Sequence, residues 1–235
     1  SAAAAGRARA GPRRVTHPPH PRSRALDRAT GARPSPGNIV RHIADSSAAL
    51  NVMLEMIADA ERTIHFENYI VHDDRTGTRF ATAWAERARA GVSVRVLYDA
   101  FGCRGTGRAF WRELRSHGVD VRPFRPIWGS GPIEAFSRDH RKLLVVDGER
   151  AMTGGLCIGD EWAGDPATGT PSWRDTMVMV CGPAVAALEA GFGRMWARAG
   201  APLTGDELSL VADECGPSAI RVVEGVPGQS RIYRA

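Results

Sequence analysis

Residues 138–162 read RDHRKLLVVDGERAMTGGLCIGDEW, and they contain the clearest structural pattern in the chain. The apolar run at 143–146 predicts a strand that begins near His140. Asp147-Gly148 predicts a two-residue hairpin turn into a second strand over residues 149–153. Because side chains alternate between the faces of a strand, His140 and Lys142 should share a face, about 7 Å apart along it. A single phosphate group is small enough to contact both.

Lys142 is the only lysine in the chain, although Lys and Arg together number 31. A lysine ammonium is a compact point charge and an arginine guanidinium is a planar fork, so the two are not interchangeable at a tight phosphate site. Taken alone, Lys142 is as readily a chance surface residue as a phosphate ligand. Gly154 and Gly155 either let the backbone approach a ligand or simply form a loop. For Asp147, we favour a role in the turn over direct catalysis.

Length and composition indicate a globular protein with one sizeable domain: the chain has 235 residues, 43% of them hydrophobic and 24% charged. The sequence has no run of about 18 apolar residues, so we expect no membrane-spanning segment. The four cysteines show no CxxC spacing, which argues against a zinc site or a disulfide framework and makes a reducing compartment the default. We therefore predict neither a metal nor a cofactor.

The positive charge is concentrated near the start of the chain. Residues 1–36 contain eight arginines and one aspartate, whereas the whole chain has a formal net charge of +5, so the remainder is slightly acidic. Residues 1–37 are rich in Ala, Pro and Arg and lack apolar periodicity, which predicts a disordered tail. Such a tail can contact anionic lipid or nucleic acid, but a simple solvated segment is the more common case.

From residue 38 onward, strand-like and helix-like patterns alternate. We predict strands over 39–45, 63–71, 92–100, 119–124, 140–146, 149–153 and 173–180, and helices over 48–60, 78–90, 108–117 and 183–198. Ser46 or Ser47 is expected to cap the first helix. This alternation predicts an α/β domain over residues 38–200, with a mainly parallel sheet flanked by helices on both faces. Residues 201–235 are predicted to be a linker that leads into a further strand.

Ligands of such sheets bind at the carboxyl ends of the strands. Glu67 lies within one predicted strand and Asp99 at the end of the next, although pairing with a neighbouring arginine or backbone group explains either carboxylate more simply. The loop at 125–138 contains Trp128 and Phe136, which either meet a lipid chain or form a local apolar cluster. We slightly favour the cluster.

The pattern His140-x-Lys142-x4-Asp147, followed by Gly154-Gly155, resembles the HKD motif of the phospholipase D superfamily. Several blocks are similar to the bacterial cardiolipin synthase branch of that superfamily: FENYI at 66–70, VLYDAFG at 96–102, RDHRKL at 138–143, GGLCIGDEW at 154–162 and WRDT at 173–176. The resemblance covers residues 38–235. It implies a phospholipase D-like domain with a mixed sheet and a reaction that needs no metal.

The reaction that the resemblance implies is phosphatidyl transfer. One motif histidine attacks the phosphodiester phosphorus and forms a phosphohistidine, and a histidine from a second HKD motif protonates the leaving alcohol. Carried over, His140 is the nucleophile or the acid, and Lys142 holds the non-bridging oxygens. Asp175 would hold an imidazole in the required tautomer. Asp147 completes the motif and so belongs to the candidate catalytic set.

The same resemblance places Glu67, Gly154, Gly155 and Cys157 around the bound substrate. Family members usually have asparagine at the position of Cys157. A thiol is a weak hydrogen-bond donor, so we expect a phosphate contact to be weakened or lost here. A reactive thiol at Cys157 is the minor alternative.

A phospholipase D active site needs two motifs, and this chain contains one, because Lys142 is its only lysine. Ile220 and residues 230–233 resemble the opening of a second half. We therefore expect the N-terminal half of a longer two-motif enzyme. A homodimer that supplies the second motif, as in single-motif members of the superfamily, is the alternative.

The leading hypothesis is a cardiolipin synthase-like phosphatidyltransferase that acts on phosphatidylglycerol and contacts the cytoplasmic side of a bacterial membrane peripherally. A hydrolytic phospholipase D would instead transfer the phosphatidyl group to water. A dimeric single-motif phosphodiesterase or nuclease would need a basic groove, and the near-neutral folded part argues against nucleic acid as a partner. The remaining alternative is an inactive membrane-binding fragment.

Overall fold

The computed structural model describes residues 21–126, 137–165, 167–209 and 211–225. Its strands are β1 Ser35–Ile43, β2 Thr63–Asn68, β3 Ser93–Asp99, β4 Asp120–Phe124, β5 Leu143–Val146, β6 Arg150–Gly154, β7 Met177–Cys181 and β8 Ser218–Ile220. Its helices are α1 Pro21–Thr30, α2 Ser46–Ala58, α3 Arg75–Arg89, α4 Arg108–Ser116, α6 Asp160–Ala163 and α7 Ala184–Arg198, with a 3₁₀ helix, η1, at Gly205–Glu207. Within these ranges no helix is both long and apolar enough to cross a bilayer.

The strands form one open sheet in the order β4-β3-β2-β5-β6-β7-β1-β8. The α/β class and the mixed sheet are confirmed. The sheet is parallel only where β2, β3 and β4 pair, and the other strand pairs are antiparallel. The expectation of a mainly parallel sheet is therefore corrected. The helices α3 and α4 provide the long crossovers that parallel neighbours require, whereas short connections such as the β5–β6 turn allow only antiparallel pairing.

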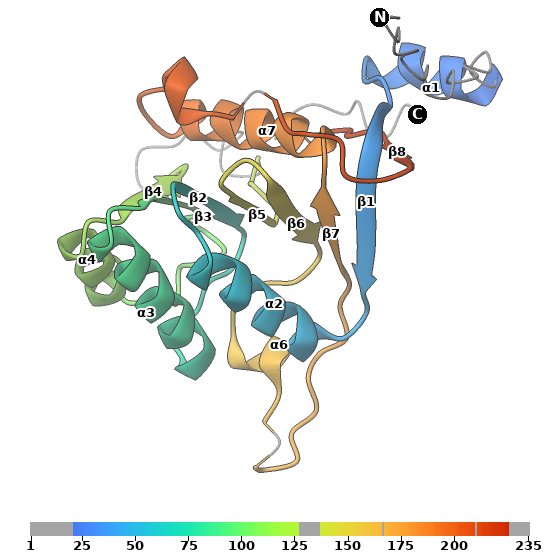
Figure 1. The fold of residues 1–235 in the computed structure, drawn as a ribbon. Helices are drawn as coiled ribbons and strands as arrows, with labels where there is room; N and C mark the ends of the chain where they lie inside the picture. Colours follow the sequence, from blue (N-terminus) through green and yellow to red (C-terminus); the bar gives the residue numbers. More distant parts are fainter. Residues whose placement is uncertain (1–20, 127–136, 166, 210, 226–235) are drawn as a thin grey trace, which may run out of the picture.

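Helices cover both faces of the sheet, as predicted (Figure 1). On one face α2, α3, α4 and α6 enclose a core in which the Phe66 ring packs on Trp84 at a centroid distance of 4.7 Å. On the other face α7 lies across the sheet and buries Phe192 and Trp196 against Val145. The two layers leave the end of the sheet at the carboxyl terminus of β2 to be lined by loops.

The start of α2 differs from the prediction in a way that matters for the site. Asp45, rather than a serine, caps the helix, with its carboxylate accepting a hydrogen bond from Ala48 N at 2.6 Å. The Ser46 hydroxyl donates to Trp173 O at 2.6 Å and accepts from Asp175 N at 3.0 Å. Ser46 therefore fixes the segment that leads into β7.

Part of the predicted disordered tail is ordered. Residues 21–30 form α1, and β1 begins at Ser35, so the prediction of disorder through residue 37 is wrong for this portion. Arg221 holds α1 by donating to the Asp27 carboxylate and to Ser23 O. Composition alone does not reveal such a contact, because Arg221 is far away in the sequence. Residues 1–20, the loop residues Trp128 and Phe136, and residues 230–233 lie outside the described ranges.

The β5–β6 hairpin is anchored at its turn by Asp147. Asp147 and Gly148 have φ angles of 55° and 68°, the left-handed values that Asp-Gly hairpin turns adopt, so the turn is confirmed. The Asp147 carboxylate accepts hydrogen bonds from the backbone N–H groups of residues 61, 62 and 63 at 2.7–2.9 Å. The strands are shorter than predicted, with β5 beginning at Leu143 and β6 at Arg150. Asp147 thus ties the turn to the start of β2.

We predict that Asp147→Ala lowers the free energy of unfolding by about 2–4 kcal/mol, because three partly buried hydrogen bonds from the N–H groups of residues 61–63 lose their acceptor at once. Glu149→Ala, which removes only an exposed ion pair with Arg62, should cost less than about 1 kcal/mol. Urea denaturation followed by circular dichroism measures both values. Equal small losses would contradict the anchoring role of Asp147.

Candidate active site

The site is built where β2 ends and β5 begins. These strands are antiparallel, and the pairing of Glu67 with Leu143 places the residues before β5 beside those after β2. The His140 ring lies 4.7 Å from the Tyr69 ring between centroids, and Lys142 Nζ lies 5.2 Å from the centre of the same ring. His140 and Lys142 therefore lie on one side of the chain, against Tyr69, although β5 itself begins only at Leu143.

His140 is exposed, whereas Lys142 retains only 4% of its accessible surface. The Lys142 ammonium donates one hydrogen bond to His140 O at 2.8 Å. An ammonium has three N–H donors, so Lys142 keeps donor capacity for an incoming anion. Burial lowers the pKa of Lys142, and the nearby groups Cys157, Asp139, Asp175 and Asp99 act in the opposite direction. The buried cation is thus placed among groups that favour its charged form.

Partial desolvation of the otherwise exposed ring lowers the pKa of His140 below its ordinary value of 6.5, and the positive charge of Lys142 lowers it further. The carboxylates of Asp139 and Asp99 partly oppose these effects. A lowered pKa keeps the imidazole neutral at neutral pH, where its ring nitrogen has a free lone pair. The pair therefore combines a potential nucleophile with a cation that can stabilise negative charge on a phosphate.

Asp175 lies close to this pair without touching the histidine. Its carboxylate accepts a hydrogen bond from Thr176 N at 2.7 Å and interacts electrostatically with Lys142 and Cys157. Among the described residues, no hydrogen bond or ion pair joins Asp175 to His140. The predicted orientation of an imidazole by Asp175 is therefore not present in this conformation.

Gly154 and Gly155 make room for the Asp175 segment. A Cβ atom at Gly155 would lie 2.2 Å from Asp175 Oδ1, and one at Gly154 would lie 2.2 Å from Thr176 O. Any side chain at either position would push the segment away from Lys142. The glycines thus act by permitting close packing. Gly154 also borders a cavity of about 160 Å³ that His140 and Lys142 line.

Cys157 is 97% buried, and burial raises the pKa of its thiol while Lys142 lowers it to a smaller extent. A buried thiol with a raised pKa remains protonated at neutral pH and reacts slowly. The alternative of a reactive thiol is therefore not supported. Cys157 instead packs in the hydrophobic core and is not among the residues that line the cavity with His140 and Lys142.

Glu67 does not line the cavity with His140, contrary to the expectation. It is fully buried on the α7 side of the sheet, where Arg141 Nη2 donates to its carboxylate at 2.9 Å. Burial raises the pKa of Glu67, and the charge of Asp139 raises it further. Arg141 also pairs with Glu224. Because Arg141 lies between His140 and Lys142 in sequence, Glu67 influences the motif by holding the residue between them.

One residue of the site prediction, Asp147, remains to be placed. Asp147 lies at the opposite end of β5 from His140, and its carboxylate is occupied by backbone N–H groups. Tyr69, which our sequence analysis did not single out, contacts both His140 and Lys142. The sequence feature that could have identified Tyr69 as a site residue is its position directly after the strand that contains Glu67. A larger cavity of about 510 Å³ borders Arg141, Arg194 and Arg198, but neither His140 nor Lys142 lines it.

We predict that Lys142→Met raises the pKa of His140 relative to the unaltered chain, because it removes the neighbouring positive charge that favours the neutral ring. Arg112→Met, which removes a positive charge from the exposed side of α4, should leave this pKa unchanged. Titration of the histidine ring signals by NMR gives both values. An unchanged or lowered pKa in Lys142→Met would show that the two side chains do not interact.

Comparison with known proteins agrees with this geometry. Residues 53–196, more than half of the chain, match the family described as "Cardiolipin synthase, PLD-like domain". The chain is 37% identical over 176 residues to cardiolipin synthase A of Pseudomonas aeruginosa, covering 74% of this chain and 35% of that protein. It is 39% identical over 177 residues to a cardiolipin synthase of Geobacillus kaustophilus, covering 72% of this chain and 34% of that protein. The chain thus spans about a third of the length of these relatives.

Solved structures show the same fold. Phosphatidylserine synthase of Haemophilus influenzae superposes with a TM-score of 0.55 at 15% identity, covering 72% of this chain and 39% of that one. Nuc of Salmonella typhimurium, a phospholipase D family member, superposes with a TM-score of 0.51 at 17% identity, covering 70% of this chain and 96% of that one. The chain belongs to the cardiolipin synthase family of phospholipase D-like domains.

Proposed function

We propose that this chain is one catalytic half of a cardiolipin synthase-type phosphatidyltransferase that uses phosphatidylglycerol. The observation that carries the proposal is the position of the only lysine, Lys142. It is buried beside His140 and Tyr69 with donor capacity to spare. A buried ammonium is costly unless an anion or hydrogen-bond acceptor compensates it, and a phosphodiester meets that need. The names of the sequence relatives, which are cardiolipin synthases, support a phospholipid as the source of this phosphodiester.

In the proposed reaction, the neutral ring of His140 attacks the phosphorus of phosphatidylglycerol. A phosphorus–nitrogen bond forms, the phosphorus–oxygen bond to the headgroup glycerol breaks, and a second histidine gives that oxygen a proton. The hydroxyl of another phosphatidylglycerol then attacks the phosphohistidine and loses its proton to the second histidine. Cardiolipin is released and His140 is regenerated. Lys142 stabilises the non-bridging oxygens in both steps.

The second histidine must come from outside this motif. A further HKD motif in the same protein or the same motif in a second copy of the chain would supply it. Residues 222–224 form part of the wall of the cavity that His140 and Lys142 line. A segment in this position is suited to lead from one half-site to the other. We assign Asp175 the role of orienting an imidazole once substrate binding has rearranged the site.

We also propose that the protein contacts the membrane peripherally, on its cytoplasmic side. Trp173, two residues before Asp175, is 59% exposed, and Phe101, which follows β3, is 42% exposed. Tryptophan is favoured at the boundary between water and lipid. Phe101 is bordered by the guanidinium group of Arg104, an exposed residue that can pair with anionic headgroups.

We predict that the chain, if two copies complete the site, forms cardiolipin and glycerol from phosphatidylglycerol vesicles, with a rate per chain that rises with protein concentration. His140→Ala should lower the rate by at least about a thousandfold, because it removes the nucleophile. His42→Ala, which alters an exposed histidine on β1, should retain full activity. Mass spectrometry of the lipids measures the product.

Other outcomes of this assay separate the alternatives. Phosphatidic acid without cardiolipin would indicate a hydrolytic phospholipase D, and cleavage of single-stranded DNA in place of lipid would indicate a nuclease. An inactive chain that gains activity when co-expressed with the sequence encoded downstream of Ala235 would place the second motif in the same protein. Equal lipid product from the unaltered chain and His140→Ala, with the downstream sequence present, would contradict the proposal.

A separate prediction concerns Cys157, which stands where family members usually have asparagine. Cys157→Asn should raise kcat/KM about tenfold, because an amide gives the phosphate a hydrogen bond of about 1.5 kcal/mol that a thiol does not. Cys103→Asn is not a suitable control, because the Cys103 thiol itself accepts a hydrogen bond from Val71 N and donates one to Tyr69 O. Cys157→Ser is the better comparison, because serine adds a hydroxyl donor on a side chain that is shorter than that of asparagine. A loss of activity in Cys157→Asn with unchanged thermal stability would argue against a phosphate contact here.

A further inference from the structure

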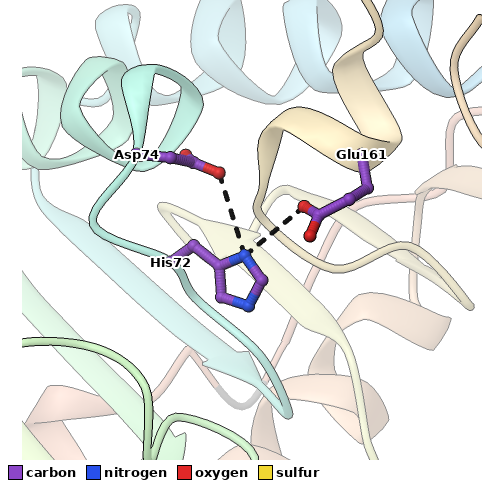
Figure 2. A group of neighbouring side chains, drawn as sticks. All are labelled: His72, Asp74 and Glu161. Carbon is purple, nitrogen blue, oxygen red and sulfur yellow. Dashed lines mark ion pairs between the residues drawn. The ribbon is translucent and has the colours of Figure 1, made fainter.

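Three side chains that the proposed reaction does not use converge at the amino-terminal end of α3 (Figure 2). His72 lies in the segment after β2, Asp74 is the N-cap of α3, and Glu161 belongs to α6. His72 Nδ1 is 3.4 Å from Glu161 Oε2 and 3.8 Å from Asp74 Oδ2. One ligand atom from each residue lies within 4.8 Å of the other two.

These separations are too long for a well-formed ion pair centred on a protonated histidine. Charge-assisted N–H···O bonds measure about 2.7–2.9 Å, and the single N–H at His72 Nδ1 cannot point at two oxygens at once. A cation bound about 2.1 Å from each ligand in tetrahedral geometry holds those ligands about 3.4 Å apart. The two separations from His72 Nδ1 are therefore close to the spacing of ligands around such an ion, and the three ligand atoms all lie within 4.8 Å of one another.

The space between two of these ligand atoms is kept open by Gly159. A Cβ atom at this position would lie 2.7 Å from Glu161 Oε2 and 3.0 Å from His72 Nδ1. Gly159 has a φ of 179°, an extended conformation that any residue can adopt, so backbone geometry does not explain the glycine. The absence of a side chain instead preserves a volume bordered by an imidazole nitrogen and a carboxylate oxygen.

Glu161 Oε2 provides a second observation. This oxygen is shielded from solvent and accepts no hydrogen bond from any described residue, although the Glu161 side chain as a whole is 40% exposed. A buried carboxylate oxygen without a donor is costly, and a bound cation would offset that cost. This is the same oxygen that faces His72 Nδ1 in Figure 2.

Hydrogen bonds with the backbone hold Asp74 and the His72 segment in place. Asp74 Oδ1 accepts from Gly77 N at 2.8 Å, and Asp74 Oδ2 accepts from Asp160 N at 2.7 Å. Each carboxylate oxygen has a second lone pair, so the atom that faces His72 remains able to bind an ion. His72 N donates to Ile158 O at 2.9 Å, which fixes the two ligand-bearing segments relative to each other. Such hydrogen bonds around the ligands orient metal sites in proteins.

We propose that His72, Asp74 and Glu161 form a binding site for a divalent transition-metal cation, with Zn²⁺ as the best match. One imidazole nitrogen and two carboxylate oxygens are ligands that Zn²⁺ accepts, whereas Mg²⁺ and Ca²⁺ favour ligand sets made only of oxygen. The ion would join the segment after β2, the start of α3 and α6. These segments continue from Tyr69 and Cys157, so the cation would brace the wall of the candidate active site without contacting His140. The site does not depend on the proposed reaction.

The test measures Zn²⁺ binding to the metal-stripped chain by isothermal titration calorimetry, with Co²⁺ absorption as a second readout. The unaltered chain should bind one Zn²⁺ with high affinity, and Co²⁺ should give the visible spectrum of a low-symmetry site. Glu161→Gln removes a ligand charge at nearly constant volume, and Gly159→Ala fills the space while keeping all three ligands. Each should weaken Zn²⁺ binding at least tenfold and abolish the Zn²⁺-dependent rise in Tm. Glu86→Gln, on the exposed side of α3, should change none of these values.

Equal Zn²⁺ affinity in the unaltered chain, Glu161→Gln and Gly159→Ala would overturn the proposal, because the metal would then bind at other histidines. A His72 ring that titrates as an imidazolium and shows no NMR shift with Zn²⁺ would reassign the cluster as an ion-pair network. If Gly159→Ala unfolds in the absence of metal, Glu161→Gln decides the question, since its side chain has almost the same size.

Discussion

The antiparallel pairing of β5 with β2, held in register by Asp147, is the constraint on which the candidate site depends. Asp147 binds the backbone at residues 61–63, and from that point each β5 residue has a fixed partner on β2 up to the pair Leu143–Glu67. A shift of one residue would exchange the faces of the strand. It would then place Arg141 where Lys142 now meets Tyr69. Asp147, at the far end of β5, thus helps to determine which cation lies beside Tyr69 and His140.

The two sides of the motif have different roles. On one side, partial desolvation and the nearby Lys142 lower the pKa of His140 and keep its ring neutral. On the other, Arg141 is held by Glu67 and Glu224 and restrains the backbone between the two reactive side chains. The glycine pair at 154–155 then lets the segment containing Asp175 approach Lys142. The placement of His140 and Lys142 on one side of the chain therefore depends on the ion pairs that Arg141 makes on the other.

Local patterns predicted most of the fold, and long-range contacts account for the rest. The strand and helix positions follow from apolar periodicity, and glycines with the left-handed φ angles common after helices, Gly91 at 91° and Gly118 at 87°, follow α3 and α4. Periodicity could not show that β5 inserts beside β2, that Glu67 faces away from His140, or that Arg221 orders α1. The sequence was enough to predict that His140 and Lys142 lie together, because they are two residues apart. It could not predict that His72 lies beside Glu161, since these residues are far apart in the sequence.

The central claim is that His140 forms a covalent bond to the phosphatidyl group. The most direct measurement is to incubate the protein, with its second motif supplied, with phosphatidylglycerol, quench the reaction with base and map adducts by mass spectrometry. The account predicts an acid-labile phosphatidyl adduct on the peptide that contains His140, absent from His140→Ala. Cardiolipin formation with no adduct at His140, and with full activity in His140→Ala, would contradict it.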